Sequence, residues 1–129
     1  MQTKFKDIAQ YYLGTGLEIV DTPSNTNGYL NGINPDEIYF QDGWYSSNRF
    51  KPLLRSLDSL TKPITVKGYN DDKEFVPAEE IFVGAWGKHA EYYIKNGNIL
   101  DLSFIQIELL LKWHFNVFNL PETEYIKID

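Results

Sequence analysis

The chain has 129 residues, of which 43% are hydrophobic and 16% aromatic, and its 12 Lys and Arg against 18 Asp and Glu give a net charge of −6. This size and composition predict a single domain, residues 1–129, with a packed core, and they exclude an intrinsically disordered chain. The acidity argues against direct nucleic-acid binding, whose affinity comes largely from basic side chains on phosphates, and it favours a partner with a basic surface. The alternative interpretation is that the charge only keeps the protein in solution.

The sequence contains no cysteine, which excludes disulfide bonds, Cys-ligated metal sites and a thiol nucleophile. Residues 1–14 lack the continuous apolar run of a signal peptide. The longest apolar-rich segment, residues 104–118, is interrupted by polar residues and is too short to span a bilayer. We therefore expect a cytoplasmic protein without a membrane segment.

Apolar residues at three- and four-residue spacing predict a first helix over residues 4–13, which Gly14 and Gly16 end. Residues 17–20 alternate as expected for a strand. A turn-rich stretch follows, and within it Tyr29 and Leu30 are expected to form a short edge strand.

A further strand is predicted over residues 37–40, and residues 41–47 (QDGWYSS) are expected to form a loop. Residues 50–60 combine an extended start with a helical turn at residues 56–60. Pro63 ends that turn, because the residue before a proline is disfavoured in the helical conformation.

Residues 64–67 and 74–77 have the alternation of a β-hairpin whose tip is polar and acidic. Residues 78–83 are expected to form a helical turn with acidic residues near its start. A second short helix is predicted over residues 89–95, ended by Asn96-Gly97 through a left-handed cap.

The last helix is predicted to start at Ser103, which forms a capping box with Gln106, and to end at Asn119-Leu120-Pro121. It has two apolar faces and is expected to lie between layers. One face consists of Phe104, Ile107, Leu111, Phe115 and Phe118, and the other of Leu109, Leu110, Trp113 and Val117. The elements together predict a single α+β domain, in which a small antiparallel sheet packs on a long C-terminal helix with short peripheral helices.

Residues 49–62 (RFKPLLRSLDSLTK), 75–77 (FVP) and 110–120 (LLKWHFNVFNL) carry a family resemblance. In order and spacing they resemble KPILRPLSDLTK, KFVP and LLEWHFDVFGL segments of small hypothetical proteins encoded by bacterial prophages. The resemblance covers roughly the last two-thirds of the chain, and Asn116 departs from it by replacing Asp. It implies an accessory gene of a phage or prophage, and it brings no established activity.

His114 borders an apolar stripe, where a histidine is more often a hydrogen-bonded boundary residue than a ligand. A metal site would require His114, His89 and a distant acid to converge. No Gly-x-Ser-x-Gly elbow, dinucleotide fingerprint or phosphate-binding loop is present in the sequence. We therefore expect a protein that is not an enzyme and has no catalytic residue, metal or cofactor, with a metal-dependent hydrolase as the least favoured alternative.

Asp71, Asp72 and Glu74 form the clearest acidic cluster, at the tip of the predicted hairpin. One interpretation is a phosphate-mimicking patch that docks on a basic groove, and the other is a solvated turn.

Trp44, Tyr45 and Trp86 all lie near glycines, and the chain has more aromatic residues than a small core needs. They are candidate anchors of a protein interface, or aromatic residues that fold over the edge of the core. The excess of aromatic residues is consistent either with a binding surface or with a bias in the amino-acid composition of the chain.

These observations predict a non-enzymatic, phage-encoded accessory protein that binds a host protein in the bacterial cytoplasm. The most specific version is an inhibitor of a host defence nuclease, such as an anti-CRISPR protein that acts on a guide-RNA-loaded effector. The alternative is a structural or assembly accessory of the phage particle. The sequence leaves open the identity of the partner, the binding face and the oligomeric state.

Overall fold

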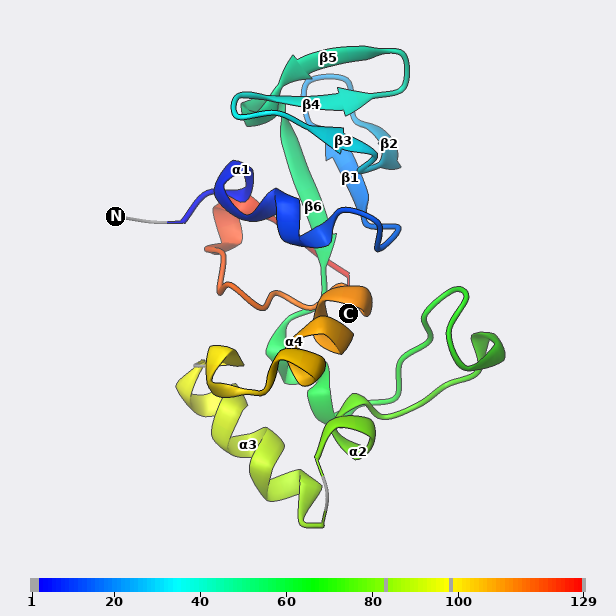
Figure 1. The fold of residues 1–129 in the computed structure, drawn as a ribbon, viewed down its shortest axis with the longest axis vertical. Coiled ribbons are helices and arrows are strands. Elements are labelled where there is room, and N and C mark those ends of the chain that lie inside the picture. Colours follow the sequence, from blue (N-terminus) through cyan, green and yellow to red (C-terminus); the bar gives the residue numbers. More distant parts are fainter. Residues whose placement is uncertain (1–2, 83, 98, 129) are drawn as a thin grey trace.

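The four-stranded sheet joins segments from both ends of the chain. Figure 1 shows the computed structural model, which describes residues 3–82, 84–97 and 99–128. The sheet has the strand order β2-β1-β6-β7. β1 is antiparallel to β2 and β6, whereas β6 and β7 are parallel, so the sheet is mixed rather than antiparallel as predicted. The strands are β1 (Glu18–Asp21), β2 (Thr26–Tyr29), β6 (Phe50–Leu54) and β7 (Ile126–Lys127).

A second, antiparallel sheet has the order β3-β4-β5 and consists of β3 (Gly32–Ile33), β4 (Glu37–Phe40) and β5 (Gly43–Ser46). The strand predicted over residues 37–40 is confirmed. The predicted loop over residues 41–47 is wrong, because Gly43–Ser46 pair with β4 through a turn at Gln41 and Asp42. Gln41 takes a φ of 59° there, a conformation that hairpin turns usually give to glycine or asparagine, so the position of this turn was not evident from the residue type.

The first predicted helix is confirmed as two consecutive pieces, whose buried side chains are those of the predicted apolar face except Leu13. The helical turn at residues 56–60 is likewise confirmed as η3. The helices are α1 (Phe5–Ile8), α2 (Pro77–Ile81), α3 (Trp86–Asn96) and α4 (Phe104–Lys112). The short 3-10 helices are η1 (Ala9–Tyr12), η2 (Ser47–Arg49), η3 (Leu57–Thr61), η4 (Asn70–Asp72), η5 (Ile99–Asp101) and η6 (Glu122–Glu124).

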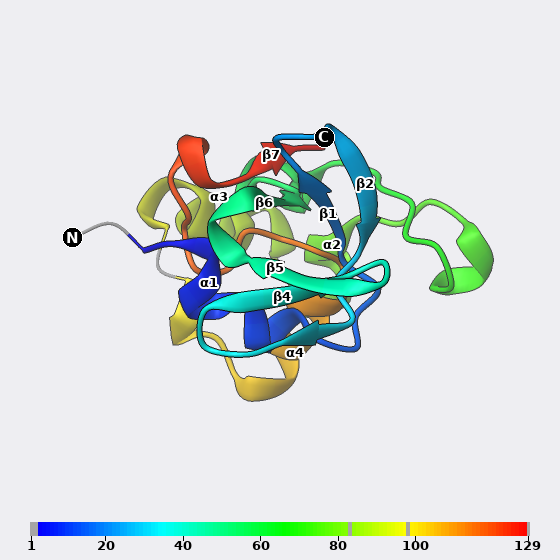
Figure 2. The same cartoon turned by 90° about the horizontal axis from the view of Figure 1, so that it is seen from above.

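α3 starts at Trp86, three residues before the predicted start, and ends as expected at Gly97, whose φ is 68°. The helical turn predicted over residues 78–83 corresponds to α2, and Val83 lies outside the described residues. The predicted hairpin reduces to one antiparallel bridge between Ile64 and Phe75. Between these two residues the chain forms a loop that contains η4 and projects away from the rest of the molecule in both views (Figures 1 and 2).

The long C-terminal helix is not confirmed, because α4 begins at the predicted capping box and ends at Lys112. His114 has a φ of 63°, and its N–H donates to the carbonyl of Leu111 while the N–H of Phe115 donates to that of Leu110. This pair of bonds is a Schellman cap, which usually has glycine at the left-handed position. The chain then pairs with the end of β6, since Arg55 and Phe115 form a parallel bridge.

The core has two clusters of buried side chains. One gathers around Trp113 from η3, α2, α3 and α4, and the other gathers around Tyr12 and Ile19 from η1 and both sheets. Leu111 and Phe118 pack against both clusters and so connect them. The Tyr12 hydroxyl reinforces this junction by donating to the carbonyl of Phe115, which belongs to the first cluster. The result is a small α+β domain, as predicted at this coarser level.

Candidate functional site

Trp44 and Tyr45 alternate on β5 and differ in exposure. Trp44 is 47% exposed and its ring packs edge-on against Tyr39 at 5.4 Å between centroids. Tyr45 is half-buried against the core, and the Arg49 guanidinium lies 5.0 Å above its ring. Arg49 also forms a bidentate ion pair with Asp21 at 2.8 and 2.9 Å. Of the two predicted anchors on β5, Trp44 is therefore the more accessible to a partner.

Asp71, Asp72 and Glu74 are all exposed on the projecting loop. Asp71 and Asp72 have φ values of 54° and 59°. The Asp72 carboxylate accepts a hydrogen bond of 2.6 Å from the N–H of Gly68, so it closes the loop on itself.

Trp86 begins α3 and is half-buried against the core cluster that contains Trp113. β5 and α3 lie at opposite ends of the long axis of the molecule in Figure 1, and the η4 loop projects to one side. The structure therefore distributes the six predicted partner-binding residues over three places. They do not form one site.

An exposed apolar cluster that the sequence analysis did not single out lies at the start of α4. Phe104 is 77% exposed, Ile105 is 73% exposed and Leu100 is 53% exposed. All three fall within one stretch of six residues. We call these three residues the α4 patch. Phe104 had been placed in a buried stripe, which the structure contradicts. Ile105 belonged to neither predicted apolar face, and this was the one feature of the sequence that indicated an exposed apolar side chain here.

Acidic residues flank the α4 patch in the sequence, and their side chains are exposed. Asp101 follows Leu100 directly, and Glu108 lies about one helical turn after Ile105. The Ser103 cap holds this segment in place, because its hydroxyl accepts the N–H of Gln106 and its own N–H donates to the Gln106 side chain at 2.9 Å. Gln106 also donates to the carbonyl of Ile81 at 2.9 Å. The patch is thus displayed on a fixed helix start.

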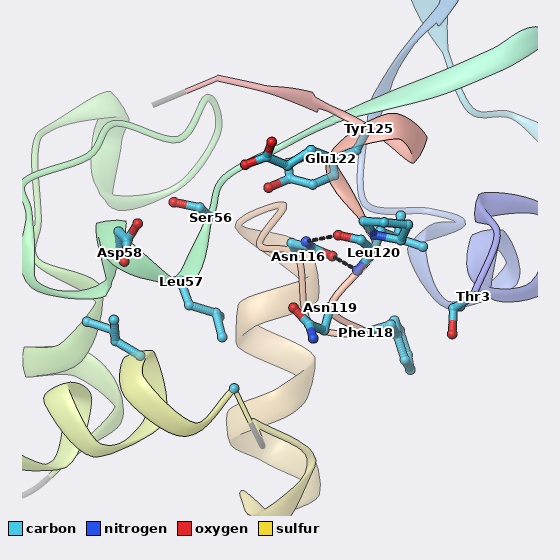
Figure 3. Close-up of a pocket in the computed structure, with 13 residues that line it drawn as sticks. Thr3, Ser56, Leu57, Asp58, Asn116, Phe118, Asn119, Leu120, Glu122 and Tyr125 are labelled. Atoms are coloured by element: carbon cyan, nitrogen blue, oxygen red, sulfur yellow. Dashed lines mark hydrogen bonds between the residues drawn. The ribbon is translucent and has the colours of Figure 1, made fainter. Parts of the chain in front are cut away.

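A hollow of about 580 Å³ lies beside η3 and the C-terminal segment (Figure 3). Ser56 and Asp58 lie on one side of Asn116, and Leu120 lies on the other. The Asn116 amide donates to the Leu120 carbonyl at 3.1 Å and accepts its N–H at 2.8 Å. An ionised Asp could not donate the first of these bonds. Asn116 therefore fixes the backbone at residue 120, and its polar atoms are engaged within the fold.

A second cavity of about 620 Å³ is lined by His114, Arg55, Lys67 and Glu18 among others. His114 Nε2 donates to the Thr15 carbonyl at 2.8 Å, and burial lowers the pKa of the imidazole. His89 instead stacks on Phe82, with 5.6 Å between ring centroids. Within residues 3–82, 84–97 and 99–128, no three His, Asp or Glu side chains are grouped so as to hold a metal ion.

None of the helices in the described part of the chain is long and apolar enough to cross a membrane. Searches of family models, of curated proteins and of solved structures give no match to this chain. The candidate surfaces therefore stand on their own geometry, and the α4 patch is the most exposed apolar one among them.

Proposed function

We propose that this chain is a non-enzymatic, phage-encoded accessory protein that binds a host protein, most specifically as an inhibitor of a host defence nuclease. The observation that carries the proposal is the α4 patch. Leaving a Phe and an Ile side chain in water costs about 1.5–3 kcal/mol each relative to full burial. Clustered apolar exposure of this kind is typical of protein-binding surfaces. On this proposal, the patch is buried in the complex.

The chemistry around the patch defines the partner. Asp101 and Glu108 border the apolar side chains, and the chain carries a net charge of −6. A complementary surface has an apolar recess with Lys or Arg at its rim, and charge complementarity would speed the encounter. Nucleases that hold a guide RNA present basic channels. The resemblance of residues 49–62, 75–77 and 110–120 to prophage-encoded proteins separately supports a target in the bacterial host.

The projecting loop supplies a second contact in this proposal. Asp71, Asp72 and Glu74 place carboxylates on a loop that extends from the body of the molecule, where they would take the position of phosphates in the basic channel. Trp44, Tyr45 and Trp86 lie apart from this loop, so we do not assign them to the same contact.

Phage plating tests the proposal in the host cytoplasm. A bacterial strain with an active CRISPR system that targets a test phage is given the wild-type chain, the Phe104→Ser/Ile105→Ser double variant, or Trp44→Ser as a matched control. We expect wild type and Trp44→Ser to restore plaques, and the double variant to fail at equal protein level. Full immunity in the presence of the wild-type chain would contradict the proposal for that system.

The alternative function is a structural or assembly accessory of the phage particle. The α4 patch favours it too, because the same apolar side chains would suit an assembly of identical chains. Light scattering on the purified chain separates the two. A stable oligomer that the Phe104→Ser/Ile105→Ser substitution converts to monomers would support the assembly function. A metal-dependent hydrolase that uses His89 and His114 has no such observation in its favour.

A further inference from the structure

A small hollow of about 190 Å³ lies between α1 and η2, beside the start of β6. α1 packs against η2, and the Phe5 N–H donates to the Glu124 carboxylate at 3.2 Å, which brings the C-terminal η6 to the same place. The hollow is smaller than the usual small-molecule pocket of about 300–1,000 Å³, so it has room for a single ionic group rather than a whole organic ligand. Its lining includes Lys4, Lys6, Ser47, Asn48, Lys51 and Glu124.

Three lysines line this hollow in a chain whose net charge is −6. Lys4 and Lys6 flank Phe5, which is buried and anchors the start of α1, and Lys51 lies on β6. Among the described residues, none of the three lysines forms an ion pair. Glu124 is the opposing carboxylate of the lining, and it already accepts the Phe5 N–H. The lining is therefore positive, which is opposite in sign to the chain as a whole.

Ser47 adds a hydroxyl that the fold leaves unused. The residue is only 5% exposed, and in the described part of the chain its hydroxyl has no hydrogen-bond partner. Its backbone is fixed, because the Ser47 N–H donates to the Asp36 carbonyl at 2.9 Å and the Ser46 hydroxyl accepts the N–H of Asn48. Buried polar groups in proteins nearly always have a partner. Because Ser47 lines the hollow, a ligand there would supply one.

We propose that this hollow binds a phosphate group, either inorganic phosphate or the phosphate of a small monoester. Lysine is a common phosphate ligand, because its ammonium group is a compact charge with three donors that can rotate. A phosphate group carries about −1.5 to −2 charge at neutral pH and has several acceptor oxygens, so it can contact the lysines and the Ser47 hydroxyl together. The site is independent of the proposed host-protein contact, since none of its lining residues belongs to the α4 patch or to the projecting loop.

Titration of the full-length, isotope-labelled chain with inorganic phosphate and with glycerol 3-phosphate tests the proposal by NMR. We expect saturable shifts of the amides of Phe5, Ser47, Asn48 and Lys51 with at least one of the two. Tighter binding of the ester would assign the site to phosphomonoesters, and tighter binding of the bare ion would assign it to inorganic phosphate. Sodium chloride at the same ionic strength is the control, because it screens charges without offering several oxygens. Absence of saturation, or the same shifts with sodium chloride, would overturn the proposal.

Single substitutions assign the binding to this hollow. Ser47→Ala should weaken phosphate binding about tenfold, as expected for the loss of a hydrogen bond to a charged group. Lys51→Gln removes a cation and should weaken it a few-fold, whereas Lys88→Gln, on the exposed face of α3, is the control and should leave the affinity unchanged. Glu124→Gln can still accept the Phe5 N–H through its amide oxygen, and it should strengthen binding. Equal effects of Lys51→Gln and Lys88→Gln, or unchanged binding by a folded Ser47→Ala variant, would overturn the assignment.

Discussion

His114 and Thr15 lie 99 residues apart in the sequence and are joined by a hydrogen bond of 2.8 Å from the imidazole Nε2 to the carbonyl oxygen. The bond holds a histidine at the left-handed end of α4, where φ is 63°. It therefore helps to turn the chain out of the helix and into its pairing with Arg55. This contact joins the end of α4 to the turn at residues 14–16, so each helps to hold the other in place.

Substitution of His114 by glycine and by alanine separates the backbone cost from the hydrogen bond. Both variants lose the bond to Thr15, and only alanine keeps a Cβ in the left-handed conformation. Because that conformation costs roughly 1 kcal/mol for a residue with a Cβ, we expect His114→Ala to be about 1 kcal/mol less stable than His114→Gly. Urea unfolding of the two variants measures the difference. Equal stabilities would show that the cap is not strained.

Stability should fall as the pH is lowered through the histidine range. Burial lowers the pKa of His114 below its usual value. The hydrogen bond to the Thr15 carbonyl opposes this lowering in part, Arg55 adds to it, and Glu18 opposes it. The unfolded chain therefore takes up this proton at a higher pH than the folded one. The stabilisation is fully present above about pH 6.5 and declines below it.

His114→Asn tests this pH dependence, because asparagine tolerates the left-handed conformation and does not titrate. Between pH 7.5 and 5.5, roughly the interval around the histidine pKa, its unfolding free energy should change less than that of the wild type. Parallel slopes for the two proteins would contradict the assigned role of His114.

The Tyr12 hydroxyl joins the two core clusters by donating to the Phe115 carbonyl, and it accepts the Val117 N–H at 3.4 Å. Tyr12→Phe removes this hydroxyl, although the Val117 N–H still donates to the Phe115 carbonyl at 2.9 Å, and the lost hydrogen bond should cost about 1 kcal/mol. Tyr11→Phe is the control, because Tyr11 is about half exposed, and it should stay within about 0.5 kcal/mol of wild type. Chemical denaturation measures both, and equal losses would argue against the buried bond.

The capping box at Ser103 should contribute measurably to stability. Ser103→Ala removes the acceptor for the Gln106 N–H and should destabilise the protein by about 1 kcal/mol. Ser103→Asp restores a capping oxygen and should recover most of that loss. Thermal unfolding of the pair provides the test, and a fully stable alanine variant would mean that packing alone holds the start of α4.

The sequence predicted those elements whose signals are local. Gly97 ended α3 and Ser103 began α4 as expected, because a left-handed glycine and a capping box each act over a few residues. The end of α4 was not predictable in this way. His114 is neither glycine nor asparagine, and the turn depends on Thr15 and Arg55, which are distant in the sequence.

The sequence analysis did not predict the α4 patch, and the reason is related. Apolar periodicity predicts that Phe104 shares a face with Ile107, and it does not say whether any part of the chain covers that face. In the structure, Ile107 packs against the core while Phe104 lies beyond its edge. The acidic loop was recognised from composition alone, but its separation from Trp44 and Trp86 depends on the tertiary fold.

Equilibrium binding of the purified chain to a purified guide-RNA-loaded nuclease tests the central claim most directly. Wild type, Phe104→Ser/Ile105→Ser and Trp44→Ser are compared by biolayer interferometry. Two anchor residues at an interface are expected to weaken binding by about 100-fold or more when both are lost, while Trp44→Ser leaves the affinity unchanged. Saturable binding that depends on the α4 patch is the predicted result. Binding that survives the double substitution, or no binding by the wild type, would contradict the account.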